Sequence, residues 1–365
     1  MTSMALYTVD RFQAGDAMAG FAASSFVIGS LLARLFAGRL LDVVGRRKML
    51  TASLVVFIVV AVAYIPTRSL WLLLLLRLVH GVAYGAGNTA LTAAVQAIIP
   101  PLRRSEGTGY FGLSMTLAAA VGPLLGTVLG AQGHFTQIFW WCAASSVVAM
   151  AGALLVRLPE HPADAEQRRT WWRISPRTMI DPVTAPIGLV MLFSAIAYSG
   201  IITFLSSYAR QFDVVGAASL FFIVYAAATL LSRMVLGRIQ DTIGDNAVMY
   251  PVMLLFAASL LLLALWPTAT SVVLAGALAG VGFGGIIPCA QTIAVHASEP
   301  RRIGLAIATF FLMFDAGSGL GPVLLGALVP WTGFRGIYLA LAGLMVPTTV
   351  LYTVVHGVRT RRTDA

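Results

Sequence analysis

Asp315 is the residue of this 365-residue chain whose setting most clearly implies chemistry. It falls midway along an apolar run that we expect to be helical over 302–329, just before the stretch Gly-Ser-Gly-Leu-Gly-Pro at 317–322. Apolar surroundings disfavour the charged form of a carboxyl group, so its proton can be taken up and released reversibly. We therefore predict that Asp315 couples function to protons. The alternative is a permanently protonated acid that only donates a hydrogen bond in helix packing.

Arg77 is a second charged residue in apolar surroundings, because it interrupts a run of leucines in the stretch 70–98. A guanidinium inside a bilayer is costly and usually functional. The alternatives are that it extends to the membrane interface or only bonds to backbone. Four uncharged polar residues in apolar runs are predicted to line a cavity, although each alone also fits an interhelical hydrogen bond: Asn88, Gln96, Gln291 and Thr292.

The composition shows which elements must position these residues. Apolar residues make up 59% of the chain and charged residues only 10%, against roughly 25% charged in soluble domains. A membrane-spanning helix takes about 20 apolar residues. The chain is therefore predicted to be an all-α polytopic membrane protein of about eleven transmembrane helices. The apolar runs give the following spans, to within several residues at each end: 17–41, 49–66, 70–98, 104–131, 136–157, 185–208, 216–239, 246–267, 270–297, 302–329 and 333–356.

A polar stretch with four prolines divides these runs. It predicts an N-terminal bundle over 1–157, a linker over 158–184, a C-terminal bundle over 185–358 and a tail over 359–365. Most arginines fall in the linker or on its side of the membrane, and the positive-inside rule then makes the linker and the C-terminus cytoplasmic. The same clustering between apolar runs argues against nucleic acid as the partner implied by the net charge of +10. Trp171 and Trp172 are expected at the membrane interface.

The two halves repeat each other at an offset of 199 residues. This predicts two pseudo-symmetric bundles, a known transporter plan. The span 185–208 finds a counterpart only near Met4–Val9, so the first of twelve helices is expected to be missing or the start codon misassigned. One register aligns these sets: Gly38, Arg39, Asp42 and Gly45 with Gly237, Arg238, Asp241 and Gly244; Gly81 and Gly85 with Gly280 and Gly284; Pro101 and Arg103 with Pro300 and Arg302; Gly122 and Pro123 with Gly321 and Pro322.

Three motifs resemble the major facilitator superfamily, most closely its twelve-helix drug:proton antiporter branch. The stretch Gly38–Lys48, with Arg46 and Arg47, resembles the family's loop between helices 2 and 3, and Arg77–Gly85 resembles its helix-4 motif. The run Gly122-Pro123-Leu-Leu-Gly126 resembles its helix-5 antiporter motif, with Ala118 and Thr127 in place of two usual glycines. The second half carries the related residues Gly321, Pro322 and Gly326.

The resemblance implies a role for each motif. The Asp42 loop would act as a cytoplasmic gate, and Arg77 would tune the protonation of a carboxylate. Independently, a carboxylate at a helix C-terminus is poorly placed and needs a partner, such as another helix's N-terminus or an arginine. The alternative is a solvated loop with a role in folding or topology. The glycines around Pro123 and Pro322 suit either a hinge between halves or static packing.

The function expected is a proton-coupled secondary transporter that exports small organic molecules by alternating access. No nucleophile elbow, phosphate-binding loop, paired carboxylates or metal-like histidine spacing is visible, so neither an enzyme nor a cofactor is expected, and uphill transport must use an ion gradient. The expected partners are a small-molecule substrate, protons and the lipid bilayer, with the chain a monomer in the plasma (inner) membrane. The alternatives are an importer or facilitator of a sugar or metabolite, and a non-transporting truncated membrane protein.

Overall fold

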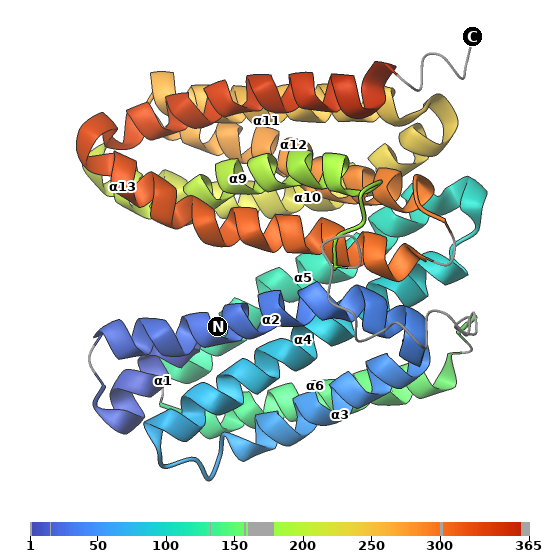
Figure 1. Ribbon diagram of the computed structural model, residues 1–365. Helices are drawn as coiled ribbons and strands as arrows, with labels where there is room; N and C mark the ends of the chain where they lie inside the picture. The colour runs from blue at the N-terminus through green and yellow to red at the C-terminus, as the bar shows by residue number, and fades with distance from the viewer. Residues whose placement is uncertain are drawn as a thin grey trace. The chain divides into compact units, whose positions relative to one another are not determined.

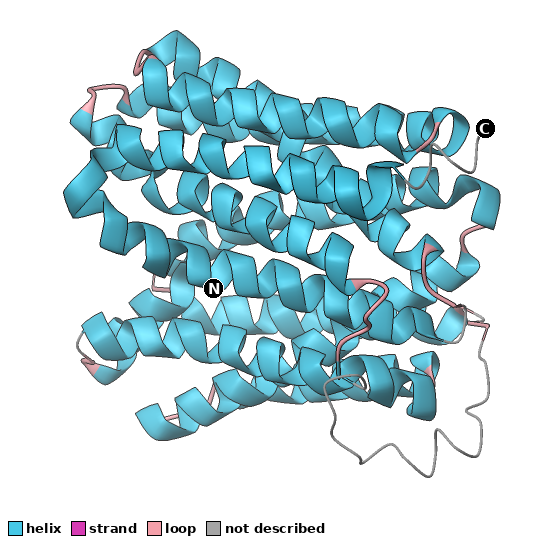
Figure 2. Cartoon of the chain, turned by 45° about the horizontal axis from the view of Figure 1, so that its top comes forward, coloured by secondary structure: helices cyan, strands magenta, loops and turns pink. Residues whose placement is uncertain are grey.

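The computed structural model describes residues 2–14, 16–131, 133–156, 158–159, 179–299 and 302–358. Over these residues the chain is helical, with short turns and without strands (Figure 2). This confirms the predicted all-α class. Most of the predicted linker, with Trp171 and Trp172, and the tail 359–365 lie outside the described residues.

The helices begin and end close to the predicted limits, because long apolar runs separated by short polar turns leave little choice of boundary. They are α1 (Thr2–Phe12), α2 (Asp16–Val44), α3 (Arg46–Ala63), α4 (Leu70–Ile98), the 3-10 turn η1 (Pro101–Arg103), α5 (Arg104–Ala131), α6 (Phe135–Leu155), α9 (Ala185–Gln211), α10 (Val215–Ile243), α11 (Asp245–Leu265), α12 (Ala269–His296), α13 (Ile303–Tyr352) and the π-helical turn η3 (Thr353–Gly357) (Figure 1).

Glycines with positive φ mark the tightest turns. Gly45 joins α2 to α3 with φ 93°, and its repeat partner Gly244 joins α10 to α11 with φ 111°. Only glycine adopts such angles at no steric cost, so both loop motifs need glycine here. Gly333, with φ 64°, interrupts α13 and divides it where the sequence predicts a boundary between two spans.

Eight stretches of the described helices are long and apolar enough to cross a membrane. One of them, Ile303–Gly357, is 55 residues long and includes the break at Gly333. Its length corresponds to two spans of about 20 residues. The chain is therefore a multi-pass membrane protein, with the predicted count of eleven spans approximate.

The chain divides into two compact units. Unit 1 comprises Met1–Ile98, Leu117–Asp181 and Glu299–Thr309, and unit 2 comprises Ile99–Thr116, Pro182–Ser298 and Phe310–Ala365. In unit 1, α4 packs on α2 and α3, and α3 packs on α6. In unit 2, α12 packs on α10, α11 and α9. The first turns of α5 thus belong with unit 2, and the first turns of α13 with unit 1.

A polar network ties the end of the last helix to the start of α11 in unit 2. His356 Nε2 lies 2.7 Å from Asp245 Oδ2. Tyr352 donates its hydroxyl hydrogen to Asn246 Oδ1 over 2.8 Å, and Asn246 Nδ2 donates to the carbonyl oxygen of Gly357 over 3.0 Å. The last described turn is therefore fixed by side-chain bonds as well as by apolar packing.

Candidate functional site

Arg77 projects from α4 into the interior of unit 1, where only 4% of its surface is exposed. Its Nε donates to the backbone carbonyl of Ala22 on α2 over 3.0 Å. Its guanidinium carbon lies 4.9 Å from the centroid of the Phe26 ring, within the range of a cation–π interaction. The charge is therefore held by a carbonyl dipole and an aromatic face.

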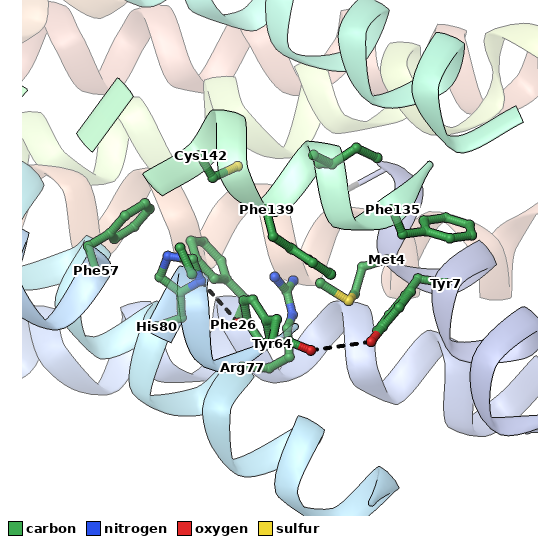
Figure 3. A pocket seen from close by; sticks show the side chains of 12 residues that line it. Met4, Tyr7, Phe26, Phe57, Tyr64, Arg77, His80, Phe135, Phe139 and Cys142 are labelled. Carbon is green, nitrogen blue, oxygen red and sulfur yellow. Dashed lines mark hydrogen bonds between the residues drawn. The ribbon is translucent and has the colours of Figure 1, made fainter. Parts of the chain in front are cut away.

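A cavity of about 190 Å³ opens beside Arg77 (Figure 3). Tyr64 Oη lies 3.0 Å from His80 Nδ1, and Tyr7 donates its hydroxyl hydrogen to the Tyr64 carbonyl over 3.4 Å. The described residues that line the cavity include no carboxylate, so the acid partner implied for Arg77 stays a prediction. The lining comprises Met4, Tyr7, Phe26, Phe57, Ala61, Tyr64, Arg77, His80, Phe135, Ile138, Phe139 and Cys142.

The sequence analysis did not include Tyr7, Tyr64 or His80 among the candidate residues. One signal was available, because Arg77 and His80 are three residues apart and so share a helix face. The aromatic residues come from α1, α2, α6 and α3 with its C-cap Tyr64, and the rotations of these helices cannot be read from the sequence. Apolar walls with a few convergent polar groups are typical of small-molecule sites.

The second loop motif places a carboxylate on the N-terminus of a helix. In unit 2, Asp241 near the end of α10 accepts hydrogen bonds from the backbone N–H of Ser105 over 3.0 Å and of Glu106 over 2.9 Å. Both residues lie in the first turn of α5, which begins at Arg104. A helix N-terminus has unpaired N–H groups and a partial positive charge, and a carboxylate satisfies both. The partner that the sequence analysis expected for Asp42 is thus observed for its repeat partner, Asp241.

The glycine one turn before this carboxylate explains the close approach. A Cβ on Gly237 would lie 2.6 Å from the Ser105 carbonyl oxygen, too close for any side chain. In unit 1, a Cβ on Gly38 would lie 2.6 Å from the Cα of Leu305, at the start of α13. Because Ser105 and Glu106 align with Gly304 and Leu305 in the repeat, the two motifs contact equivalent turns. The side chain of Asp42 lies outside the described residues.

The basic residues of the first loop motif bond to the end of α6 and beyond. Arg46 donates from Nη1 to the carbonyl oxygen of Pro159 over 2.7 Å, and Arg47 donates from Nη2 to that of Leu154 over 3.0 Å. Arg39 and Arg238, at equivalent positions near the ends of α2 and α10, complete the predicted gate motif. Whether any of these residues forms a gate stays a prediction.

Asp315 lies on α13 in unit 2 and is partly buried. Directly after it, Gly317 and Gly321 contact α9 closely, at Ala195 and Ser199. In the first-half motif, a Cβ on Gly122 would have no neighbour within 4 Å among the described residues. Gly126 of the same motif is buried, and the side chain of Pro123 lies outside the described residues. In the second half, Pro322 lies inside α13. The nearest described atom to a Cβ on Gly326 is a ring carbon of Phe204, at 3.9 Å.

The four uncharged polar candidates lie on α4 and α12. Asn88 lines a cavity of about 270 Å³ in unit 1. Gln96 is fully buried on α4, and Gln291 is buried on α12. Thr292 donates its hydroxyl hydrogen to the Pro288 carbonyl one turn earlier over 3.0 Å. Asn88 thus borders a cavity, and a role for any of the four residues in lining a substrate site stays a prediction.

Two duplicated helical units, membrane-length apolar helices and matched loop motifs define a class, the polytopic membrane transporters built by duplication. The model of the Major Facilitator Superfamily matches residues 1–214 and 187–364. The chain belongs to this family, as its motifs predicted.

Curated relatives and solved structures agree with this assignment. The uncharacterized MFS-type transporter YhhS of Escherichia coli K12 is 26% identical over 352 residues, covering 91% of this chain and 82% of the relative. The multidrug resistance protein MdtG of Klebsiella pneumoniae is 24% identical over 332 residues, covering 89% and 80%. The human organic anion transporter MFSD10 has the same fold, with a TM-score of 0.76 at 18% identity over 96% of this chain and 88% of that one. So has the transporter FucP in its outward conformation, with a TM-score of 0.74 at 15% identity over 97% and 95%.

Proposed function

We propose that this member of the family is a proton-coupled secondary active transporter that exports small organic molecules by alternating access. The names of relatives such as the multidrug resistance protein MdtG support export. The distribution of arginines supports an inner-membrane protein with a cytoplasmic C-terminus. We further propose that it works as a monomer, with its two bundles as the moving parts.

The observation that carries this proposal is the hydrogen-bonded contact of the Asp241 carboxylate with the first turn of α5. The contact joins a carboxylate to two backbone N–H groups through hydrogen bonds of 2.9 and 3.0 Å. Side-chain caps of this kind contribute about 1–2 kcal/mol. That is strong enough to favour one conformation and weak enough to break in every transport cycle, as a gate requires.

Two further roles complete the mechanism. Asp315 carries the proton, because it is an acid within an apolar helix beside the tight contact of α13 with α9. Arg77 supplies a fixed positive charge next to the cavity of unit 1 and tunes the protonation of a carboxylate. Substrate and proton then compete for binding, which couples their opposite movements.

The test is transport of a fluorescent cationic dye by purified protein in liposomes with an imposed pH gradient. We expect Asp315→Asn to abolish gradient-driven flux while the protein elutes as a folded species. Asp213→Asn, on an exposed turn, is the matched control and keeps the normal flux. Full gradient-driven flux in Asp315→Asn would contradict the proton role.

The direction of flux separates the alternatives. Dye movement against the proton flow supports export, whereas movement with it supports an importer. Absence of gradient-driven and downhill flux for a panel of organic cations, anions and sugars, in protein that melts cooperatively, favours the non-transporting alternative.

A further inference from the structure

The cavity beside Arg77 contains a hydrogen-bonding atom that no other described residue satisfies. His80 lines this cavity and is 6% exposed, and its Nε2 is buried without a hydrogen-bond partner among the described residues. The other nitrogen of the same ring, Nδ1, lies 3.0 Å from Tyr64 Oη. Leaving a buried polar atom unsatisfied costs free energy, so a ligand that bonds to Nε2 is stabilised by a contact that the chain alone does not make.

The neighbouring Arg77 determines the direction of the bond between Tyr64 and His80. Its guanidinium has only donors, and it bonds to the side chain of Tyr64. The Tyr64 oxygen therefore accepts from Arg77, and its own hydrogen is directed to Nδ1 of His80. When Nδ1 accepts, the ring hydrogen is on Nε2. His80 thus presents a donor to the cavity, and a ligand must offer an acceptor.

Arg77 also gives the cavity a positive charge. It precedes His80 by three residues, so both side chains lie on one face of α4, and both line the cavity (Figure 3). The described lining residues include no carboxylate. Charges in apolar surroundings are screened far less than charges in water. The cavity therefore favours an anionic ligand over a neutral one, and disfavours a cation.

The walls around these two residues are aromatic. The rings of Phe26 and Phe57 lie edge-on to His80, with centroids 5.6 and 3.8 Å away. On the other side of the cavity, the rings of Tyr7 and Phe139 meet edge-on at 5.2 Å. Aromatic rings pack well against one another in edge-to-face and offset arrangements. The acceptor is therefore best carried by an aromatic ring.

The volume of the cavity limits the ligand to one ring. An apolar cavity of about 150 Å³ holds benzene, and this cavity measures about 190 Å³. The remaining space accommodates one small substituent, such as a carboxylate. Drug-sized ligands occupy pockets of about 300 Å³ or more and are too large.

We propose that this cavity binds a single-ring aromatic carboxylate, of which benzoate is the simplest. The ring packs among the aromatic side chains, and the carboxylate accepts a hydrogen bond from Nε2 of His80 next to the charge of Arg77. The inference goes beyond the proposed export function, because binding at this site requires neither a pH gradient nor flux.

The first experiment is isothermal titration calorimetry of the purified full chain in detergent. Benzoate is compared with benzamide, which keeps the ring and the shape but lacks the charge, and with cyclohexanecarboxylate, which keeps the charge but lacks the aromatic ring. We expect saturable binding of benzoate at one site. Benzamide should bind roughly tenfold more weakly, and cyclohexanecarboxylate roughly fivefold more weakly.

The role of His80 is tested with His80→Leu, which removes the donor and keeps an apolar side chain. We expect roughly tenfold weaker binding of benzoate, the usual effect of losing a hydrogen bond to a charged group. The matched control is His134→Leu, because His134 is exposed and outside the cavity. Its affinity for benzoate should equal that of the unsubstituted chain.

The location of the bound ligand is tested with Cys142, which lines the cavity. In a Cys289→Ala chain, saturating benzoate should slow the labelling of Cys142 by N-ethylmaleimide at least fivefold. The control chain carries Cys142→Ala, Cys289→Ala and Val148→Cys. Val148 is 72% exposed and outside the cavity, so its cysteine should label at the same rate with and without benzoate.

Three results would each overturn the proposal in protein that melts cooperatively. They are no saturable binding of benzoate, equal affinity for benzoate and benzamide, and saturable binding that leaves the labelling of Cys142 unchanged. Normal benzoate affinity in His80→Leu would overturn the role of Nε2. If His80→Leu does not fold, the comparison of the three ligands and the labelling of Cys142 still decide, because both use chains with His80 in place.

Discussion

The contact between α2 and α4 in unit 1 and that between α10 and α12 in unit 2 are two versions of one design. Gly81 of α4 meets the backbone carbonyl of Phe26, and its repeat partner Gly280 meets that of Tyr225. One turn earlier the versions differ. Arg77 reaches the Ala22 carbonyl with its Nε, whereas Gly276 contacts the equivalent Phe221 carbonyl directly.

This difference shows which positions a duplicated fold can change. Where two helix backbones touch, only glycine fits, and both copies keep it. Where Arg77 replaces the glycine, a buried cation and a cavity stand in place of a close backbone contact. Unit 1 thus has a buried charge at the position where unit 2 has a close backbone contact.

The strongest test of the contact that both units share is to place a large side chain at its glycine, Gly81 in unit 1 or Gly280 in unit 2. We expect Gly81→Leu and Gly280→Leu each to lower the free energy of unfolding by about 3 kcal/mol, because overpacking pushes two backbones apart. Thermal melts followed by size-exclusion chromatography measure the loss. Gly343→Leu is the control, since no atom of the part of the chain that the structure describes lies within 4 Å of a Cβ there. A tolerant Gly81 beside an intolerant Gly280 would show that the two contacts are not equivalent.

Arg77, the position at which the two contacts differ, is tested by a substitution that removes the charge of its side chain and keeps much of its shape. We expect Arg77→Gln to lower the transport rate per folded molecule at least tenfold, about 1.4 kcal/mol, because the amide keeps a donor for the Ala22 carbonyl but carries no charge. Initial dye flux in liposomes is the measurement, with the exposed Arg68→Gln as the control. Normal flux in Arg77→Gln would assign Arg77 a purely structural role.

The loop motifs offer a matched pair of smaller effects. We expect Asp241→Ala to lower the free energy of unfolding by about 1 kcal/mol, the usual loss for a helix cap. Asp42→Ala should cost as much, because Gly38 and Gly237 contact equivalent turns of α13 and α5. The melting temperature of each variant, compared with that of the unsubstituted chain, shows whether the two losses of stability are equal. Unequal losses would mean that only the second motif has a helix N-terminus as its partner.

The smallest effects concern the tyrosines of α1 and α9. We expect Tyr208→Phe to cost about 1 kcal/mol, since it removes a buried hydrogen bond of 2.8 Å. Tyr7→Phe, whose bond to Tyr64 is 3.4 Å long, should cost about half as much. Melting temperatures again measure both losses, and a larger loss for Tyr7→Phe than for Tyr208→Phe would contradict the ranking of the two hydrogen bonds by length.

Much of the fold was predictable because hydropathy and glycine positions are local signals. The apolar runs and the register of the repeat anticipated the helices, and the unfavourable place of Asp42 anticipated a helix N-terminus as the kind of partner that Asp241 has. The neighbours of Arg77 were not predictable, since Phe26, Tyr64 and Tyr7 come from three other helices whose rotations only packing determines.

The tie between His356, Gly357 and the start of α11 has a consequence for how the protein is made. These residues leave the ribosome more than a hundred residues after their partners Asp245 and Asn246. Chains generally fold in order of synthesis, so the first turn of α11 must wait in the membrane without Tyr352, His356 and Gly357, although Gln240 already donates to Asp245. Premature termination shortly before His356 would leave that turn without the bonds from His356 and to Gly357 and expose the truncated protein to membrane quality control.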